Sequence, residues 1–368
     1  MTLQIPAHLL PADGRFGSGP SKLRGAQLAR LTAPDSPMGT SHRQKPVRQV
    51  VCSIREQIAE LFHLPDGYEV ILGNGGASLF WDAITFCLVE SRPQAAVFGE
   101  FSGKVVKAIT RAPWIEGVDI RRSTPGGVAL CETAEGIDTY LYAHNETSTG
   151  ALSPVSRFGG GDALTIVDAT SAAGGGRVDI AQTDVYYFSP QKNFGGDGGL
   201  WLAIASPAAL ARIQKLTSER WVPDILNLQL AVDNSRKDQT LNTPAIATLL
   251  LIDEQLTWML EQGGLEAMAE RTESSSSSIY EWATLRSDAT PFVSNPAYRS
   301  PVVATIDFDE SVKTTSISKI LRKNGVVDID PYRSLGRNQL RIGTFPNVDP
   351  EDVESLLACL EWIIDSKR

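Results

Sequence analysis

Cysteine and histidine are scarce in this chain, and their scarcity narrows the kinds of site that it can hold. The 368 residues include four cysteines and four histidines. The cysteines form no Cys-x-x-Cys pair and the histidines show no metal-binding spacing, so we expect neither a disulfide framework nor a metal site. Such widely spaced cysteines indicate buried thiols in a reducing, cytoplasmic protein. They are Cys52, Cys87, Cys131 and Cys359.

Long apolar runs and an excess of positive charge are also missing. Runs such as residues 245–252 are shorter than the roughly 20 residues that cross a bilayer. The first residues lack the basic and apolar regions of a signal peptide. A net charge of -9 disfavours nucleic acid and anionic membranes as partners. Any anionic substrate must therefore be met by a local group of basic side chains.

The chain instead alternates between apolar strand-like runs, polar loops and helical patterns. Strands are expected at 70–72, 95–98, 139–143 and 163–167, and on both sides of a Gly-rich loop at 189–199. Helices are expected over 46–62 and from about residue 104. This order predicts an α/β fold, a large domain with a mostly parallel sheet flanked by helices. Sites in such sheets lie beyond the carboxyl ends of the strands.

The pattern changes beyond residue 244. Two long helices are expected, broken at Gly263-Gly264, and the second keeps its apolar period through the serines at 274–278. Shorter strands and helices follow, which predicts a smaller C-terminal α+β domain. The expected strands are 302–308, 326–329 and 339–343, and the expected helices are 312–323 and 350–365. The predicted divisions are an N-terminal arm at 1–15, the large domain at 16–255 and the small domain at 256–368.

Four strand-end loops carry groups that suit one cofactor. Lys192 lies in the Gly-rich loop, and a lysine held away from water can form a Schiff base. The run Gly73–Ser78 can cradle a phosphate at a helix start. Asp168 can keep a ring nitrogen protonated, and Phe101 can stack on a planar ring. Taken singly, a solvated lysine, a plain turn, a helix cap and a core aromatic are simpler interpretations. Together they indicate pyridoxal phosphate (PLP).

Six motifs, in order along nearly the whole chain, resemble the phosphoserine aminotransferase family in its actinobacterial form, within the class-V aminotransferases and the fold type I PLP enzymes. They are Arg15-Phe-Gly-Ser-Gly-Pro-Ser-Lys22, Ser41-His-Arg43, His144-Asn-Glu-Thr147, Val167-Asp-Ala-Thr-Ser171, Ser189-Pro-Gln-Lys-Asn-Phe194 and Leu241-Asn-Thr-Pro244.

The resemblance implies a role for each cofactor-binding residue. Lys192 is expected to hold PLP as a Schiff base and to move the substrate proton. Asp168 is expected to bond the ring nitrogen, Phe101 to stack on the ring and Thr147 to support the region of the ring hydroxyl. The phosphate is expected to meet one group of residues from the same chain and another from the second subunit of a homodimer. These are Ala77, Ser78 and Gln191, and, from the partner, Asn242 and Thr243.

The resemblance also implies the reaction. L-Glutamate and 3-phosphohydroxypyruvate would give 2-oxoglutarate and O-phospho-L-serine, with a phosphorylated hydroxythreonine of the vitamin B6 route as a further substrate. Arginine suits bidentate binding of the carboxylates and phosphates involved. Arg341 is expected to clamp the α-carboxylate, with Arg337 as a substitute, while other residues contact the substrate or its distal anion. The latter are Ser18, His42, Arg43 and Arg333.

Other functions share some of these parts. Alanine–glyoxylate-type transaminases and cysteine desulfurases use the same cofactor, but a desulfurase needs a reactive cysteine on a mobile loop. Cys359 lies among leucines on an expected helix, which indicates a core position. From a different class, the chain could be a nucleotide- or phosphate-binding module without catalysis. A module that binds PLP without chemistry would not need Arg43 and Arg341. A dinucleotide-binding dehydrogenase would need Gly-x-Gly-x-x-Gly after its first strand, and that motif is absent.

Overall fold

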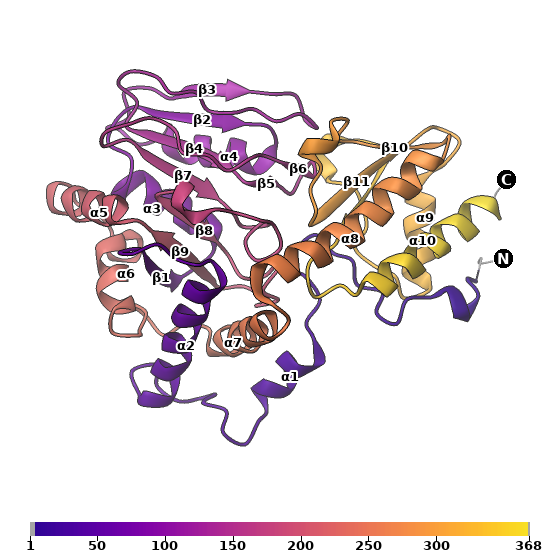
Figure 1. Ribbon diagram of the computed structural model, residues 1–368, viewed down its shortest axis with the longest axis horizontal. Helices are drawn as coiled ribbons and strands as arrows, with labels where there is room; N and C mark the ends of the chain where they lie inside the picture. The colour runs from indigo at the N-terminus through magenta and orange to yellow at the C-terminus, as the bar shows by residue number, and fades with distance from the viewer. Residues whose placement is uncertain (1–3, 367–368) are drawn as a thin grey trace.

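A seven-stranded sheet forms the centre of the larger part of the molecule (Figure 1). The computed structural model describes residues 4–366. The strand order is β1-β9-β8-β7-β4-β2-β3, and only β9 runs against its neighbours. The mostly parallel sheet predicted from the sequence is therefore confirmed. The strands are β1 (Glu69–Asn74), β2 (Pro93–Val97), β3 (Asp119–Arg122), β4 (Thr139–Ala143), β7 (Leu164–Asp168), β8 (Val185–Phe188) and β9 (Leu200–Ala205).

The loops that carry the predicted chemistry converge at one edge of this sheet. The parallel strands all end there, β1 at Asn74 and β7 at Asp168. Antiparallel β9 begins there, since Leu200 pairs with Asn74. The loop from β8 to β9, which holds Lys192, therefore stays at the same edge. A short antiparallel pair, β5 (Asn145–Glu146) and β6 (Ala151–Leu152), extends the chain beyond β4 at this edge.

Helices cover both faces of the sheet because successive strand residues point to opposite sides. Tyr186 belongs to the hydrophobic cluster on one face, and its neighbour Tyr187 belongs to the cluster on the other. Burying one such large apolar side chain stabilises the fold by about 1.5–3 kcal/mol. One face packs against α2 (Lys45–Leu61) and α7 (Ile246–Glu261), with α1 (Gly25–Leu31) beside α7. The other packs against α3 (Ala77–Cys87), α4 (Glu100–Ile109), α5 (Pro207–Glu219) and α6 (Leu228–Ser235).

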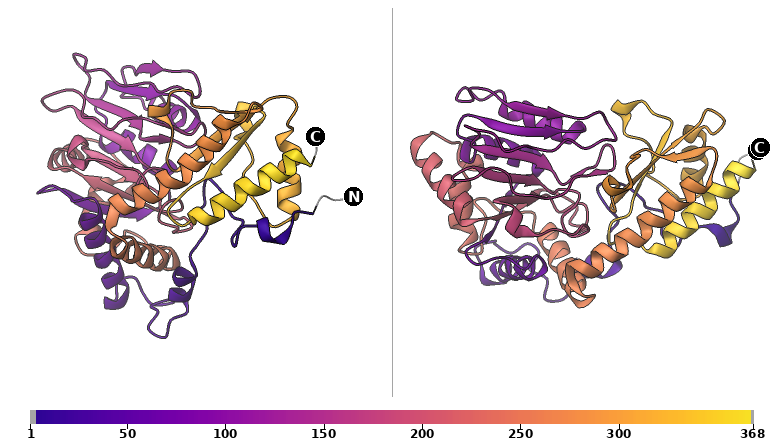
Figure 2. Two further views of the ribbon diagram at one scale, coloured as in Figure 1. Left: turned by 45° about the vertical axis from the view of Figure 1, so that its right-hand side comes forward. Right: turned by 45° about the horizontal axis from the view of Figure 1, so that its top comes forward.

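The C-terminal part has its own antiparallel sheet and its own core. Helices α8 and α10 pack side by side against it (Figure 2). Ile5 and Phe16 belong to the same core, so the start of the described chain lies close to its end. The elements are α8 (Gly264–Leu285), β10 (Ala289–Pro291), β11 (Val303–Phe308), α9 (Thr314–Lys323), β12 (Gln339–Gly343) and α10 (Pro350–Asp365). Short 3-10 turns are η1 (Ala7–Leu9), η2 (Ile180–Gln182), η3 (Asp224–Leu226), η4 (Pro296–Tyr298) and η5 (Arg333–Leu335).

The structure settles three local predictions. Helix α8 continues through the serine run, where Ser275 and Ser276 are buried, as predicted. The strand expected at 326–329 is wrong, because only Val327 forms a bridge, to Arg15 of the N-terminal segment. Helix α4 begins earlier than expected, at Glu100, because a buried carboxylate from another loop binds its first backbone N–H groups.

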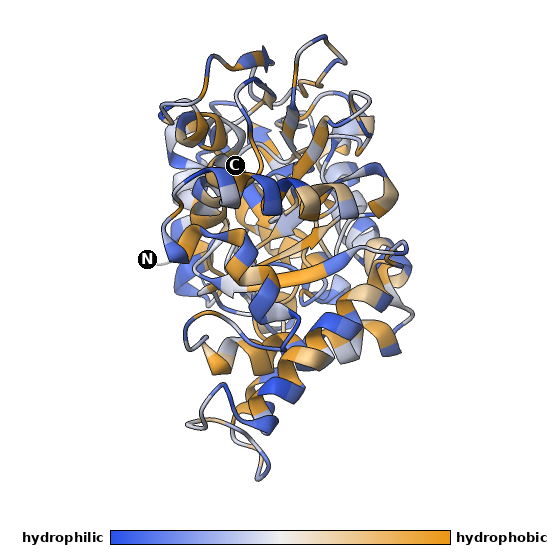
Figure 3. Ribbon diagram, turned by 90° about the vertical axis from the view of Figure 1, so that its left-hand side faces the viewer, coloured by the Kyte–Doolittle hydropathy of each residue, from blue (hydrophilic) through white to orange (hydrophobic). Residues whose placement is uncertain are grey.

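Apolar residues run along the interior strands, and polar residues face outward on the surrounding helices (Figure 3). The apolar residues are thus concentrated in the central sheet and are not gathered along any single helix. Across residues 4–366, no helix has both the length and the apolar character that crossing a membrane requires.

Candidate active site

A cavity of about 490 Å³ opens at the sheet edge where the loops converge. Residues far apart in the sequence line it, from the N-terminal loop at Gly19 to the turn at Gly199. The structure brings together seven residues that the sequence analysis singles out. They are Ala77, Ser78, Phe101, Thr147, Asp168, Gln191 and Lys192.

Lys192 is a buried amine in the lining of this cavity, with 7% of its surface exposed. Its Nζ donates a hydrogen bond to Thr147 Oγ1 at 2.9 Å. Burial, with a smaller contribution from the positive charge of Arg341, lowers the pKa of Lys192 to about 7. A substantial fraction of the amine is therefore neutral near pH 7, which is the form that attacks a carbonyl carbon.

The N-terminal loop closes over the lysine. The Ser21 hydroxyl donates to the Lys192 carbonyl at 2.6 Å, and the Ser21 N–H donates to the Gln191 carbonyl at 2.8 Å. Gly19 has a φ of +132°, which favours glycine, and a Cβ there would lie 2.9 Å from Lys192 Cε. Ser18 is buried in the same loop, but it does not line the cavity. The loop thus shields the amine from bulk water.

Asp168 ends β7 with its carboxylate held by three donors. Oδ1 accepts the Thr170 N–H at 3.0 Å. Oδ2 accepts the Tyr187 hydroxyl at 2.9 Å and the Trp81 Nε1–H at 3.3 Å. Sequence reasoning missed Trp81 and Tyr187. Their positions supplied a signal, since Trp81 lies one turn beyond the Gly-rich cradle and Tyr187 lies in the strand that leads to Lys192.

The start of α3 offers free donors to an anion. Gly75 has a φ of +111°, which favours glycine, and Gly76 is the N-cap residue. Within the described chain, the backbone N–H groups of Ala77 and Ser78 meet no acceptor. Three buried side-chain atoms of cavity-lining residues also lack partners: Asn145 Oδ1, Thr170 Oγ1 and Gln191 Oε1. Buried polar groups are normally hydrogen-bonded, so these atoms fit a polar ligand, and the free N–H groups at the start of α3 suit a phosphate on it. Sequence reasoning missed Asn145 and Thr170.

Phe101 is fixed at the cavity wall by a buried carboxylate. Glu146 is fully buried and accepts the N–H groups of Phe101 at 3.2 Å and Ser102 at 2.9 Å, at the start of α4. A Cβ at Gly99 would lie 2.2 Å from Glu146 Cγ, so glycine is required beside the carboxylate. Lys192 Nζ lies 5.6 Å from the centre of the Phe101 ring. The ring and the amine therefore face the same space.

Of the three late arginines, Arg341 bonds a residue of the cavity wall, although it does not itself line the cavity. It donates to the Thr147 carbonyl at 3.1 Å, and its guanidinium lies 5.1 Å from the Tyr332 ring centre. Its Nε is buried without a partner. Arg337 is instead exposed and paired with Asp307. Arg333, on η5, is exposed and forms no ion pair within the described residues.

The remaining predicted residues gather beside the cavity without lining it. His42 Nδ1 and Thr243 Oγ1 lie 3.2 Å apart, and Asn74 Nδ2 donates to the Thr243 carbonyl at 3.0 Å. Arg43 donates to Gln239 Oε1 at 3.1 Å. His42 is 8% exposed, and its Nε2 has no partner. The structure therefore places His42, Arg43, Asn242 and Thr243 in one group at the end of β1, next to the cradle.

Comparisons with known proteins agree with this geometry. Residues 31–329 match the family described as aminotransferase class-V. A putative phosphoserine aminotransferase of Mycolicibacterium vanbaalenii is 54% identical, over 99% of this chain and 98% of its own length. The phosphoserine aminotransferase of Corynebacterium glutamicum is 54% identical, over 98% of this chain and 97% of its own.

Solved structures share the fold. A phosphoserine aminotransferase from Cytophaga hutchinsonii has a TM-score of 0.86 at 23% identity, covering 95% of this chain and 99% of its own. One from Bacillus circulans has a TM-score of 0.84 at 23% identity, covering 97% and 99%. These similarities establish the fold, and the closer sequence relatives establish the family. The chain therefore belongs to the class-V aminotransferase family and, within it, to the phosphoserine aminotransferases.

Proposed function

We propose that the protein transfers the amino group of L-glutamate to 3-phosphohydroxypyruvate, giving 2-oxoglutarate and O-phospho-L-serine for serine biosynthesis. The observation that carries this proposal is the buried Lys192, whose pKa is lowered to about 7, in one cavity with Asp168 and the free N–H groups of α3. Family membership supports PLP as the cofactor. The names of the two sequence relatives described above support the substrate class.

Each cavity residue is assigned to a different part of the cofactor. When bound, PLP supplies an electron sink for the carbanion formed at the substrate Cα. We assign Lys192 as its covalent anchor, Asp168 as the partner of its ring nitrogen and Phe101 as the stacking side chain. Thr147 supports the region of the ring hydroxyl. The N–H groups of Ala77 and Ser78, with the Gln191 amide, bind its phosphate.

Lys192 also serves as the base. Its Nζ, neutral in part near pH 7, can accept the proton from the substrate Cα. The Thr147 hydroxyl, 2.9 Å away, orients the amine. The loop at Gly19 keeps water away from it, which protects the proton from exchange with solvent.

The two amino donors, L-glutamate and, in the reverse direction, O-phospho-L-serine, both carry an α-carboxylate and a distal anion. One basic pocket can therefore serve the half-reactions of both. Arg341, beside the cavity wall, is assigned to the α-carboxylate. His42, Arg43 and Arg333 are assigned to the phosphate or to the side-chain carboxylate of glutamate, and Ser18, in the loop over Lys192, is assigned to the substrate. A charge-assisted hydrogen bond contributes about 1.5–3 kcal/mol, so two or three such bonds offset the unfavourable net charge.

The Arg43→Ala variant tests the distal-anion assignment. Loss of one charge-assisted contact predicts a KM for phosphoserine raised by about 10- to 100-fold. The KM for alanine, which has no distal anion, is expected to stay within about twofold. Steady-state kinetics with both amino donors measures the difference. Arg48→Ala is the control, because Arg48 is exposed on α2 and its Nε bonds the Lys237 carbonyl. Equal effects of Arg43→Ala on both donors would refute the assignment.

We also propose a homodimer in which each subunit completes the other's cavity. His42, Arg43, Asn242 and Thr243 form one group but do not line the cavity of their own chain. Two large apolar side chains on the segment before this group are exposed, Leu28 at 46% and Met38 at 47%. A second subunit that covers this segment would bury both side chains. It would also bring its own phosphate cradle against the group formed by His42, Arg43, Asn242 and Thr243 of the first subunit.

Mixed dimers of an inactive variant, Lys192→Ala, and an impaired one, Arg43→Ala, test this sharing. In a Lys192→Ala/Arg43→Ala heterodimer, shared sites give one cavity with both residues intact and one with neither. Activity toward phosphoserine is then expected to return to about half that of the wild type per dimer. Differently tagged chains, co-expressed and purified by both tags, provide the sample. If each chain used its own Arg43, the heterodimer would show no more activity than the Arg43→Ala homodimer, which contradicts sharing.

The buried cysteines argue against a desulfurase. Burial raises the pKa of Cys359 to about 11, and that of Cys87 and Cys131 to about 12. Cys359 lies on α10, as the sequence predicts, and its Sγ donates to the Leu9 carbonyl.

A substrate panel separates the remaining alternatives. With glutamate as donor, phosphorylated 2-oxo acids are expected to react far faster than glyoxylate or pyruvate.

A further inference from the structure

We infer that Tyr187 and Trp81 are positioning residues that hold Asp168 as an oriented carboxylate anion and so keep the ring nitrogen of the cofactor protonated. This inference rests on the proposed function, because it concerns the bound form of the protein. Tyr187 comes from β8, the neighbour of β7 in the sheet, and Trp81 comes from α3 on the same face, so two separate elements converge on one oxygen of Asp168.

The bonds to Asp168 leave room for one more donor. A carboxylate offers about four lone-pair positions. Three are used in the structure, by the Thr170 N–H on Oδ1 and by Tyr187 and Trp81 on Oδ2. Asp168 also lines the cavity, so the remaining position is available to a ring N–H. The two side-chain donors thereby fix which part of the carboxylate faces the ligand.

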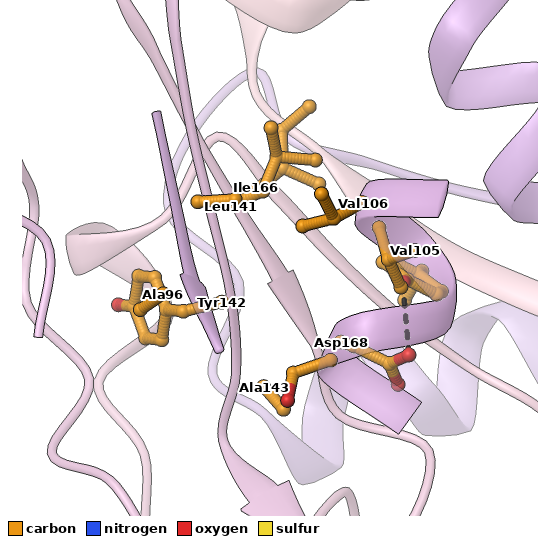
Figure 4. A pocket seen from close by; sticks show the side chains of 11 residues that line it. Ala96, Val105, Val106, Leu141, Tyr142, Ala143, Ile166 and Asp168 are labelled. Atoms are coloured by element: carbon orange, nitrogen blue, oxygen red, sulfur yellow. Dashed lines mark hydrogen bonds between the residues drawn. The ribbon is translucent and has the colours of Figure 1, made fainter. Parts of the chain in front are cut away.

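Water cannot readily take the place of the Tyr187 hydroxyl. Behind Asp168 lies a hollow of about 10 Å³, walled by side chains such as Val105, Leu141 and Ile166 (Figure 4). This volume holds at most about one water molecule, and its walls offer few polar partners. Tyr187 is 1% exposed and packs against Phe80 with ring centres 4.6 Å apart. Its hydroxyl is therefore a fixed donor in a space lined mainly by apolar side chains.

These donors act on the proton that Asp168 shares with the ring. Hydrogen bonds donated to a carboxylate stabilise its ionised form and make it a weaker base. In the pair formed by Asp168 and the ring nitrogen, the proton then stays on nitrogen. Burial and the charge of Asp168 raise the pKa of Tyr187 well above its usual value, so Tyr187 remains a donor throughout the working pH range. Without it, the proton moves toward the carboxylate.

The chain supplies a matched control in the next residue. Tyr186 is also fully buried and makes one hydroxyl contact, with His144 Nδ1 at 3.0 Å, on the opposite face of the sheet. Tyr186→Phe and Tyr187→Phe each remove one buried hydroxyl from β8, but only the second removes a donor from Asp168. Trp81→Phe removes the other side-chain donor from a different element.

The test is ¹⁵N NMR of the purified proteins reconstituted with ring-¹⁵N-labelled PLP, together with titration of each apoprotein with PLP. In Tyr187→Phe and Trp81→Phe, the ring ¹⁵N resonance is expected to move from the protonated position toward that of neutral pyridine. The Kd for PLP is expected to rise about fivefold or more, as loss of a bond to a charged group indicates. Tyr186→Phe is expected to match the wild type in both measurements.

The outcomes separate this inference from the proposed function. A wild-type protein that binds no PLP would defeat the proposed function itself. Wild-type binding with unchanged ¹⁵N shifts in Tyr187→Phe and Trp81→Phe would overturn the inference alone. Equal shifts in Tyr186→Phe and Tyr187→Phe would also overturn it, since they would reflect general packing. Circular dichroism identifies any variant that fails to fold, and Trp81→Phe then carries the test in place of Tyr187→Phe.

Discussion

Replacing Lys192 by alanine is expected to lower transamination by at least about 10⁴-fold, the upper range for loss of a positioned base, and to remove the visible absorbance of the protein incubated with PLP. The physical reason is that, in the proposed function, one amine both anchors the cofactor and moves the substrate proton. Lys192 combines burial with a pKa of about 7, which suits both tasks. Single-turnover kinetics and absorbance spectra of the variant measure the two losses.

Lys107→Ala is the control for this experiment. Lys107 is exposed on α4, two turns from Phe101 and outside the cavity, so its loss is expected to leave both spectrum and rate unchanged. A colourless wild-type protein after incubation with PLP would contradict the cofactor assignment. A coloured Lys192→Ala variant that still turns over would instead show that another lysine forms the bond.

The sequence predicts the sheet and much of the site for a common physical reason. Parallel strands with buried faces leave near-continuous apolar runs, and polar loops must follow their carboxyl ends. Lys192 lies in such a loop and Asp168 ends a strand at the same place, so the fold class alone puts both at one edge of the sheet. Gly75 and Gly76 show where the backbone can approach an anion. These features depend on local pattern and topology, which the sequence records directly.

The parts that sequence reasoning missed depend on contacts across elements. Tyr187 is an ordinary core residue by its strand pattern, and only the packing of β8 beside β7 brings its hydroxyl to Asp168. Glu146 is hidden in the same way, because its role is to bind the first N–H groups of α4. The expected strand at 326–329 is wrong because the N-terminal segment at Arg15, far away in sequence, takes up the bridge.

The structure distinguishes three C-terminal arginines that the sequence pattern does not. Spacing alone does not rank Arg333, Arg337 and Arg341, since all three lie close together near the end of the chain. Arg337 is neutralised by Asp307, whereas Arg341 has a buried Nε without a partner beside the Thr147 carbonyl. A buried, incompletely bonded guanidinium is ready to receive a carboxylate. The geometry therefore favours Arg341 for the α-carboxylate common to both amino donors.

Arg341→Ala is expected to lower kcat/KM for glutamate and for phosphoserine alike, by about 10²–10³-fold, because both lose a bidentate contact. Arg337→Ala, which removes only a surface pair with Asp307, is the matched control and is expected to change either value by less than about twofold. A larger loss in Arg337→Ala than in Arg341→Ala would reverse the assignment.

The same variant has a second, independent consequence for pH dependence. The charge of Arg341 is one cause of the lowered pKa of Lys192, and burial is the larger one. Removing that charge, and admitting water beside the amine, raises the pKa of Lys192 while burial still holds it below its ordinary value.

Only the neutral amine attacks PLP, so the rate of PLP capture by the apoprotein rises with pH through this pKa. Stopped-flow capture from about pH 5.5 to about pH 9 is expected to show a midpoint near 7 for the wild type and a higher one for Arg341→Ala. An unchanged midpoint would show that Arg341 and Lys192 do not interact across the cavity.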